Sequence, residues 1–284
     1  MEVKSFAHRL RARQSQAKSV LCVGLDPDLE RLPPSFQGET SVENAIVDFN
    51  REIIAATAQF ACAFKLNFAF YEVHGAPGWN ALEKTLELIP AEVLTIADGK
   101  RGDIGNTARF YAKSVFDSLG FDACTVAPYM GTDAIGPFLE RRDKGAFLLC
   151  RTSNASADDL QLLGGGDNSR EEPLYERVAR LSNAWNDEYP GTLGLVVGAT
   201  RPEDLRRVRS ISPTLPFLVP GVGAQGGDPR ATVNAAQTPE GIVLVNSSRS
   251  ILYAESGPDF AEAAGEAADS LRRKLSLETT DSDS

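Results

Sequence analysis

Four charged side chains crowd one short stretch of the sequence, Asp98-Gly99-Lys100-Arg101-Gly102-Asp103. The preceding residues 93–96 are apolar and indicate a buried strand, whereas residues 106–112 have the spacing of a helix. Side chains two positions apart in a strand lie on one face, so Asp98 and Lys100 are expected to project together. Such a cluster could hold a ligand or move a proton, but alone it could equally be a turn followed by a capped helix.

Two further charged residues follow or interrupt apolar runs. Lys65 lies inside the run Ala63-Phe64-Lys65-Leu66-Asn67, where a lysine needs a partner or a ligand. Asp26 ends the run 19–26, although an aspartate at such a place is more often a turn residue. Asp103 could likewise serve only as the cap of the next helix. Lys65 is therefore the stronger indication of a functional site.

A glycine-rich stretch near the end of the chain, Gly221-Val222-Gly223-Ala224-Gln225-Gly226-Gly227, contains the G-x-G-x-x-G pattern of dinucleotide sites. However, Glu240 precedes the next predicted strand rather than ending it, as a dinucleotide site would require. A phosphate loop fits better, because Arg249 follows the last predicted strand and supplies a cation. In a chain with a net charge of −10, a phosphate site must gather its cations locally.

The elements that must position these residues alternate along the whole chain. Helices are predicted at residues 5–17, 41–57, 78–88, 103–119, 132–142, 172–188, 202–210, 228–236 and 258–275. Strands, short and apolar on both faces, are predicted at residues 19–26, 61–67, 93–100, 123–128, 146–153, 193–199, 216–223 and 241–247. Eight strand–helix units without a break in composition favour a single-domain α/β fold, the (β/α)₈ TIM barrel, over an open doubly wound sheet.

This barrel is expected to occupy residues 1–276, followed by an acidic, disordered tail at 277–284. Residues 155–171 are polar and glycine-rich, and they are expected to form a flexible loop. In a TIM barrel the chemistry lies where the strands end. Asp26, Lys65, Asp98, Lys100 and the glycine-rich loop should therefore meet at one mouth.

Composition excludes several classes of function. The chain has 284 residues, of which 42% are hydrophobic and 24% charged, as in ordinary globular proteins. Its acidic balance argues against nucleic acid and anionic membranes as partners. No run reaches transmembrane length, and no signal peptide is evident. The four cysteines lie in apolar runs without C-x-x-C spacing, so we expect a cytoplasmic protein without a zinc site.

The combined motifs carry a family resemblance. Asp98-x-Lys100-x-x-Asp103-Ile104, with Lys65 on the preceding strand, resembles the orotidine 5′-monophosphate decarboxylase family. The stretch from Pro220 to Gly227 and the strand-8 Arg249 extend the likeness over most of the barrel. The long loops and Thr152-Ser153-Asn154 are similar to the larger bacterial subtype of that family.

The resemblance implies a role for each charged residue of the cluster. Asp26 would hydrogen-bond the ribose, and Lys65 would bridge the ribose hydroxyls and the carboxylate network. Asp98 would lie against the substrate carboxylate, and Lys100 would deliver a proton to C6 of the pyrimidine. Asp103 would reach into the active site of a partner subunit, which makes the protein a homodimer.

The remaining implied contacts are with the rest of the nucleotide. Thr107 would accompany Asp103, and Ser153 would contact the pyrimidine edge. Pro220 is assigned to substrate binding, and Gln225 and Arg249 would grip the 5′-phosphate. Smaller relatives usually have glycine where this chain has Ser248, so the approach of the backbone to the phosphate can differ there.

The implied reaction is decarboxylation of orotidine 5′-monophosphate (OMP) to UMP and CO₂, the last step of pyrimidine biosynthesis, without a metal or cofactor. Loss of CO₂ leaves negative charge at C6, so the protein must supply a fixed cation at that point. Lys100 is suited to this role because neighbouring carboxylates keep its amine protonated.

Three alternatives use the same residues differently. Magnesium-dependent relatives that act on sugar phosphates, such as hexulose-phosphate synthase or ketogulonate-phosphate decarboxylase, need a carboxylate at the end of the second strand, where this chain has Lys65. A Schiff-base aldolase would need Lys65 or Lys100 as an unprotonated nucleophile. A barrel that only binds a phosphate ligand would leave the charged strand ends without a purpose.

Overall fold

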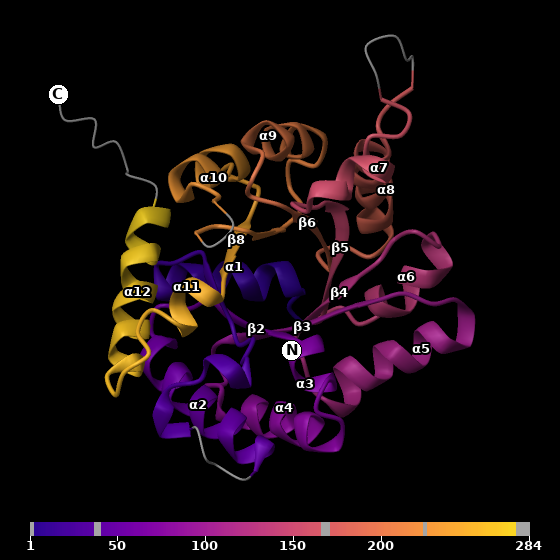
Figure 1. Ribbon diagram of the computed structural model, residues 1–284. Coiled ribbons are helices and arrows are strands. Elements are labelled where there is room, and N and C mark those ends of the chain that lie inside the picture. Colours follow the sequence, from indigo (N-terminus) through magenta and orange to yellow (C-terminus); the bar gives the residue numbers. More distant parts are fainter. Residues whose placement is uncertain (1–2, 37–40, 166–170, 224–225, 277–284) are drawn as a thin grey trace, which may run out of the picture.

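The eight predicted strands form one closed parallel barrel in the computed structural model, which describes residues 3–36, 41–165, 171–223 and 226–276. Each strand pairs with its neighbours in chain order, and the last strand pairs with the first (Figure 1). The strands are β1 Leu21–Gly24, β2 Ala63–Asn67, β3 Leu94–Arg101, β4 Ala123–Val126, β5 Gly145–Arg151, β6 Leu193–Val197, β7 Phe217–Pro220 and β8 Val243–Ser247. The predicted TIM barrel is thereby confirmed.

Helices surround this barrel and cover its outer face (Figure 1). The long ones are α1 Phe6–Ala17, α2 Val42–Thr57, α4 Ala76–Leu88, α5 Gly105–Lys113, α6 Thr132–Leu139, α8 Leu174–Glu188, α9 Pro202–Ile211, α10 Pro229–Ala236 and α12 Phe260–Leu275. Three single-turn helices lie near the strand ends: α3 Ala69–Glu72, α7 Asp158–Gln161 and α11 Arg249–Leu252. The helix predicted for 103–119 is shorter, because α5 gives way to a π-helical turn at Ser114–Ser118.

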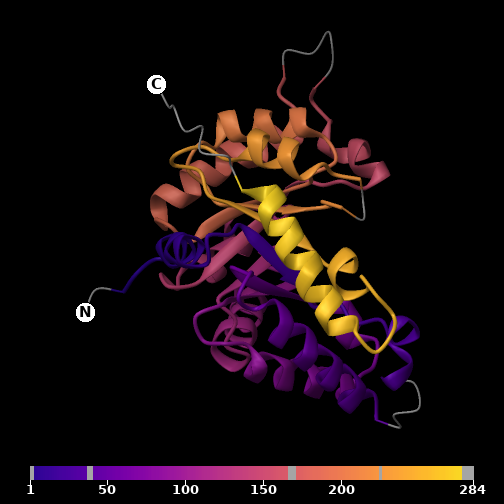
Figure 2. The same cartoon turned by 90° about the vertical axis from the view of Figure 1, so that its left-hand side faces the viewer.

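Helix α1 closes the end of the barrel opposite the functional strand ends (Figure 2). Phe6 contacts the ring of Phe147 edge to face at 5.7 Å between ring centroids. The buried Arg13 donates to the carbonyl oxygens of Ala58 and Ala61, just before β2. These contacts make the amino-terminal end a packed floor, which leaves the carboxyl ends of the strands as the open mouth.

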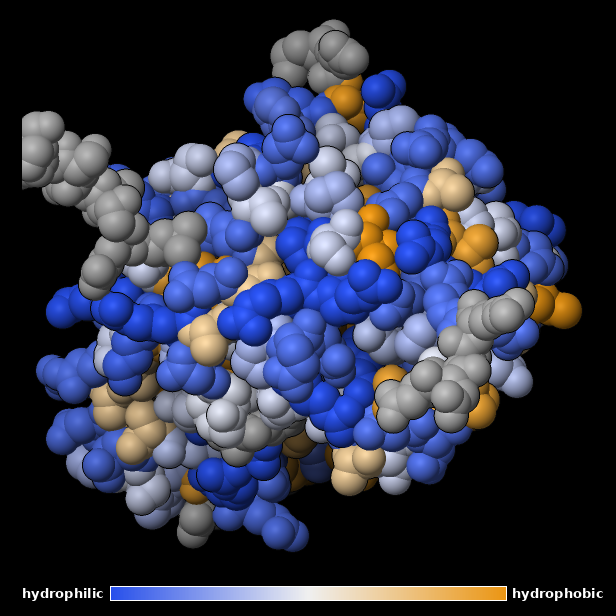
Figure 3. Space-filling view, turned by 90° about the horizontal axis from the view of Figure 1, so that it is seen from above, coloured by the Kyte–Doolittle hydropathy of each residue, from blue (hydrophilic) through white to orange (hydrophobic). Residues whose placement is uncertain are grey.

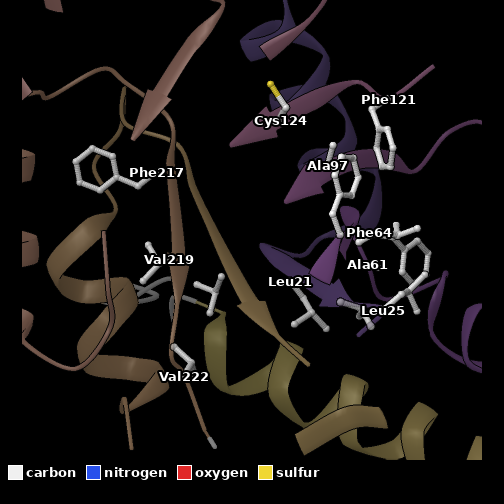
Figure 4. Packing of buried hydrophobic residues seen from close by; sticks show 14 of the residues in the cluster. Leu21, Leu25, Ala61, Phe64, Ala97, Phe121, Cys124, Phe217, Val219 and Val222 are labelled. Carbon is white, nitrogen blue, oxygen red and sulfur yellow. The ribbon is translucent and has the colours of Figure 1, made fainter. Parts of the chain in front are cut away.

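The core between strands and helices is built from large apolar side chains. Phe64 of β2, Phe121 before β4 and Phe217 of β7 are fully buried there, and Figure 4 shows Phe217 near Val219 and the other two in another part of the cluster. Burying each such side chain contributes about 1.5–3 kcal/mol. The four cysteines are buried and free, as expected for small apolar side chains.

No helix in the described part of the chain is long and apolar enough to cross a membrane. Seen from above in Figure 3, the face over α9 and α10 is mainly hydrophilic, with small and separate hydrophobic spots. This face therefore offers no extended apolar patch.

Arg209 of α9 is a buried cation that ties three segments of the barrel together. Its guanidinium donates to the carbonyl oxygens of Leu215 (2.7 Å) and Ile242 (3.0 Å) and lies 3.5 Å from the centre of the Phe217 ring. It also bonds to the carbonyl oxygens of Ala236, Ser212 and Pro213.

We expect Arg209→Met to lower the free energy of unfolding by about 3 kcal/mol, because a buried carbonyl that loses its donor costs about 1–3 kcal/mol. Urea denaturation measures this loss. Arg206→Met is the matched control, because Arg206 is exposed on the same helix and its loss should change the free energy by less than about 0.5 kcal/mol. Equal losses in the two variants would contradict the role assigned to Arg209.

Candidate active site

A cavity of about 650 Å³ opens at the carboxyl ends of the strands, a volume suited to a small-molecule ligand. Its lining combines charged side chains such as Lys65, apolar ones such as Leu149, and the segments that follow β7 and β8. The sequence-predicted residues that line it are Asp26, Lys65, Asp98, Lys100, Ser153, Pro220 and Arg249. Asn67, Thr125, Leu149, Gln161, Val196 and Asn246 also line it.

The charged wall is a row of alternating charges in the order Asp26, Lys65, Asp98, Lys100. Lys65 Nζ lies 2.8 Å from Asp98 Oδ2 and 3.8 Å from Asp26 Oδ1. Lys100 Nζ lies 2.7 Å from Asp98 Oδ1, so each Asp98 oxygen faces one ammonium group. The row arises because Lys65 and Asp98 occupy inward positions of neighbouring strands, whose register pairs Lys65 with Ile96 and Asn67 with Asp98.

Burial and neighbouring charges shift the pKa values of Asp98 and Lys65 in opposite directions, and the charges have the larger effect. Burial alone would raise the pKa of Asp98, but Lys65 and Lys100 hold it well below its usual range. Burial alone would lower the pKa of Lys65, but Asp26 and Asp98 hold it above its usual range. Asp98 is therefore an anion and Lys65 a cation at neutral pH. The side chain of Lys65 is only 5% exposed, whereas that of Lys100 is 48% exposed.

Lys100 has an unusual backbone. Its φ of +45° lies in the left-handed region, which costs a side-chain-bearing residue about 1–3 kcal/mol. The strand register also shifts here, since Ala97 pairs with Cys124 but the next pair on β4 is Arg101 with Val126. The neighbouring Arg101 turns away from the cavity and forms an ion pair with Glu72.

Asp26 is held from two sides. Its Oδ1 accepts the backbone N–H of Asn67 at 3.2 Å, and its Oδ2 accepts the hydroxyl of Ser248 at 2.7 Å. Gly24 provides the space for that hydroxyl, because a Cβ at Gly24 would lie 1.9 Å from Ser248 Oγ. Ser248 therefore connects Asp26 to the strand end that carries Arg249.

Another part of the lining is formed by the ends of β7 and β8, next to the Asp26 end of the charged row. Pro220, Gly221 and Val222 line the cavity there, and Gly221 needs its glycine because its φ is +100°. Arg249 is exposed, lines the cavity and has no ion pair with any described residue. Gln225, the other predicted phosphate contact, lies outside the described residues.

Ser153 lines the cavity just beyond the end of β5, on backbone that passes close to Gly198. The segment after it is not simply the flexible loop expected for 155–171. Asp158 of α7 accepts hydrogen bonds from Arg151 (2.7 Å) and Arg201 (2.8 Å). Arg151 is the last residue of β5, but Arg201 lies 43 positions further along the chain than Asp158, so composition alone could not reveal the anchoring. Residues 166–170 lie outside the described residues.

Asp103 and Thr107 do not line the cavity of their own chain. Asp103 does not cap the helix through the usual contact either, because Ile104 is the N-cap residue of α5 and Asp103 accepts the N–H of Ile104. Thr107 is exposed on the first turns of α5. An expected role of both residues in a partner's site therefore stays a prediction.

Sequence reasoning missed several cavity residues. Asn67 could have been found, because it lies two positions after Lys65 and thus on the same face of the strand. Thr125 is the one hydroxyl in the apolar run of β4, which was a weak signal. Gln161 lies in the segment expected to be a loop; its side chain binds the backbone N–H of Thr152 at 2.9 Å.

The chain is similar to known proteins over most of its length. The family model described as Orotidine 5'-phosphate decarboxylase / HUMPS family matches residues 19–264. A curated relative from Dehalococcoides mccartyi, named orotidine 5'-phosphate decarboxylase, is 50% identical over 94% of this chain and 96% of its own length. A relative of the same name from Delftia acidovorans is 48% identical over 95% of this chain and 98% of its own length.

A solved structure extends the likeness to three dimensions. The structure of Leishmania donovani OMP decarboxylase has a TM-score of 0.78 and 39% identity, covering 95% of this chain and 99% of that one. The family match spans all eight strands, and the curated relatives cover almost the whole chain. The chain therefore belongs to the orotidine 5'-phosphate decarboxylase / HUMPS family.

Proposed function

We propose that the chain decarboxylates OMP to UMP and CO₂ in pyrimidine biosynthesis, with Lys100 as the proton donor to C6. One observation carries this proposal. The buried carboxylate of Asp98 lies between Lys65 and Lys100 in the cavity lining, and Arg249, which has no ion pair with any residue that the structure describes, lines the same cavity. A nucleotide with its phosphate at Arg249 can present its base to Lys100.

The reaction needs only groups of this charged wall. The bond between C6 and the carboxylate carbon breaks, CO₂ leaves, and the electron pair stays on C6. The Lys100 ammonium stabilises that pair and gives it one proton, which forms the C6–H bond of UMP. The neutral amine then regains a proton from solvent, since half of the Lys100 side chain is exposed.

Asp98 contributes through its charge. Because its low pKa keeps it anionic, it repels a substrate carboxylate beside it, and this repulsion ends when CO₂ departs. An interaction that is less favourable in the ground state than in the transition state lowers the barrier. Lys65 and Asp26 supply a donor and an acceptor at the same wall for the ribose hydroxyls, and Ser153 supplies a hydroxyl for the pyrimidine edge.

The ion pairs of the wall favour this reaction over the alternatives. A Schiff base requires a neutral amine, and the raised pKa of Lys65 opposes that form. A magnesium site at the end of β2 would lie against the Lys65 ammonium, which repels a divalent cation. Insensitivity to EDTA and the lack of borohydride trapping with substrate are the expected results.

The direct test is a spectrophotometric assay that follows the loss of orotate absorbance when OMP is added to the purified protein. Turnover supports the proposal, and a protein that binds UMP but leaves OMP unchanged would contradict it.

We also propose a homodimer in which Asp103 and Thr107 enter the partner's site. Beside Asp103, several large apolar side chains are exposed: Ile104 (55%), Phe110 (65%) and Tyr129 (87%). Ile104 is the N-cap residue of α5, Phe110 lies in α5, and Tyr129 lies between β4 and α6; α5 contacts α6. A cluster of exposed apolar side chains beside a functional mouth is typical of an interface.

Arg249→Ala is expected to raise the KM for OMP by about 10- to 100-fold, because a hydrogen bond to a charged group contributes about 1.5–3 kcal/mol. Steady-state kinetics with OMP measure this change. The phosphate-free nucleoside orotidine is the control substrate, and the variant and the wild type should treat it alike. A similar rise in KM for both OMP and orotidine would show that Arg249 does not act on the phosphate.

A further inference from the structure

Thr125 lies in the interior of β4, beside the row of charges, and its hydroxyl joins the backbone of Lys100 to the side chain of Asp98. Its Oγ1 accepts the Lys100 N–H at 2.9 Å and donates its single proton to Asp98 Oδ1 at 2.9 Å. The side chain is 2% exposed and lines the cavity. The hydroxyl therefore uses its single donor and one acceptor position within the site.

These bonds close a ring at the place where β3 leaves its regular register. Lys100 N donates to Thr125 Oγ1, which donates to Asp98 Oδ1, which in turn accepts Lys100 Nζ at 2.7 Å. Three residues lie between Ala97 and Arg101 on β3, whereas only one lies between their partners Cys124 and Val126 on β4. The extra residues form a bulge, and Lys100 within it has a positive φ.

We infer that Thr125 is a positioning residue for the proton donor. It supplies the acceptor that holds the Lys100 backbone in its left-handed conformation, and it fixes the Asp98 oxygen that receives Lys100 Nζ. The inference rests on the proposed function, in which Lys100 protonates C6. No role was assigned to this residue by the charged motif or by the glycine-rich loop.

The effect of losing the hydroxyl can be reasoned from the remaining contacts. Without it, the Lys100 N–H loses its acceptor, so the bulge is free to relax and Nζ is no longer held at one place. Asp98 keeps Lys65 and stays charged. UMP has no carboxylate to place beside Asp98, so product binding should depend little on Thr125. Removing the hydroxyl should therefore lower kcat rather than the affinity for UMP.

The test uses Thr125→Val, which keeps the shape and removes the hydroxyl, and Thr125→Ser, which keeps the hydroxyl. We expect Thr125→Val to lower kcat for OMP by about 100-fold, the effect of a small misplacement of a reacting group. The Kd for UMP should stay within about fivefold, and Thr125→Ser should recover most of kcat. Amide hydrogen exchange at Lys100 should be at least about tenfold faster in Thr125→Val than in the wild type.

Thr57→Val is the matched control. Thr57 of α2 is also fully buried, but its hydroxyl donates to the Ile53 carbonyl of its own helix. Its loss should change neither kcat nor the exchange rate at Lys100. If Thr125→Val does not fold, Thr125→Ala takes its place, with folding checked by thermal unfolding.

The outcomes separate the two levels of the proposal. A wild-type protein that does not turn over OMP would contradict the proposed function. The amide exchange rate at Lys100, compared between wild type and Thr125→Val, would still test the hydrogen bond from Lys100 N–H to Thr125. An active wild type with an equally active Thr125→Val overturns the role of Thr125 alone. The role of Thr125 would also be overturned if kcat fell equally in Thr125→Val and Thr125→Ser. A fall in UMP affinity as large as the fall in kcat would overturn it as well.

Discussion

Lys100→Ala is expected to lower kcat for OMP by about 10⁴-fold or more while UMP binding is retained. The variant loses both a general acid and the fixed cation that faces the developing charge at C6. General acids contribute about 10²–10⁴-fold, and donors aimed at developing charge contribute about 10²–10³-fold. A 10⁴-fold loss corresponds to about 5.4 kcal/mol of transition-state stabilisation.

Retained UMP binding follows from where the remaining contacts lie. Asp26, Lys65 and Arg249 line other parts of the cavity, and alanine at position 100 removes none of them. Asp98 keeps its ion pair with Lys65, so no uncompensated buried charge is created. Single-turnover assays with OMP and calorimetric titration with UMP separate chemistry from binding.

Lys274→Ala is the control for the loss of a lysine in general, since Lys274 is exposed in the last turn of α12. It should turn over OMP at the wild-type rate. A Lys100→Ala variant with near-normal kcat would remove the lysine from the mechanism. A variant that also loses UMP binding would show that Lys100 acts through the shape of the site.

The barrel was predictable because its signal is local. Each strand is a short apolar run, and half of the predicted runs end at a proline, a glycine or a charged residue such as Asp26. Strand order follows from the alternation with helices, because right-handed crossovers place successive parallel strands side by side. Even so, the strand bounds differ by a few residues: β1 begins at Leu21 and ends at Gly24, within the predicted 19–26.

The details that shape the site depend on neighbours that the sequence does not place. The positive φ of Lys100 belongs to a bulge opposite β4, and nothing near Lys100 in the sequence indicates it. Ser248 could be noted as a departure from smaller relatives, but its contact with Asp26 spans 222 positions of the chain. The role of Asp103 is even harder to predict from the sequence, because the groups that it is predicted to contact belong to a second chain.

Asp98→Asn and Asp103→Asn are each expected to be nearly inactive alone and to restore activity when they share one dimer. If each site combines Asp98 of one subunit with Asp103 of the other, a mixed dimer contains one fully native site and one site with both changes. Random mixing makes half of the dimers mixed, so roughly a quarter of the wild-type activity should return. Co-expression with two different affinity tags isolates the mixed dimer, which should have roughly half.

The exposed apolar side chains make this arrangement physically reasonable. Asp103 is half-buried at the rim, and its neighbours Ile104 and Phe110 project into solvent in a single chain. Covering such side chains with a second copy removes apolar surface from water, which stabilises the dimer. In a symmetric dimer the same patch serves both subunits, so each rim meets the partner's rim.

A second pairing gives the opposite readout and therefore distinguishes the two arrangements. When a chain carrying both Asp98→Asn and Asp103→Asn pairs with a wild-type chain, shared sites leave every site with one changed carboxylate, so the mixed dimer should be nearly inactive. If Asp103 instead serves its own chain, the wild-type subunit keeps an intact site and roughly half of the activity remains. Activity in this second pairing, together with none in the first, would assign Asp103 to its own subunit. In that case the segment after β3 would have to move for Asp103 to reach the cavity.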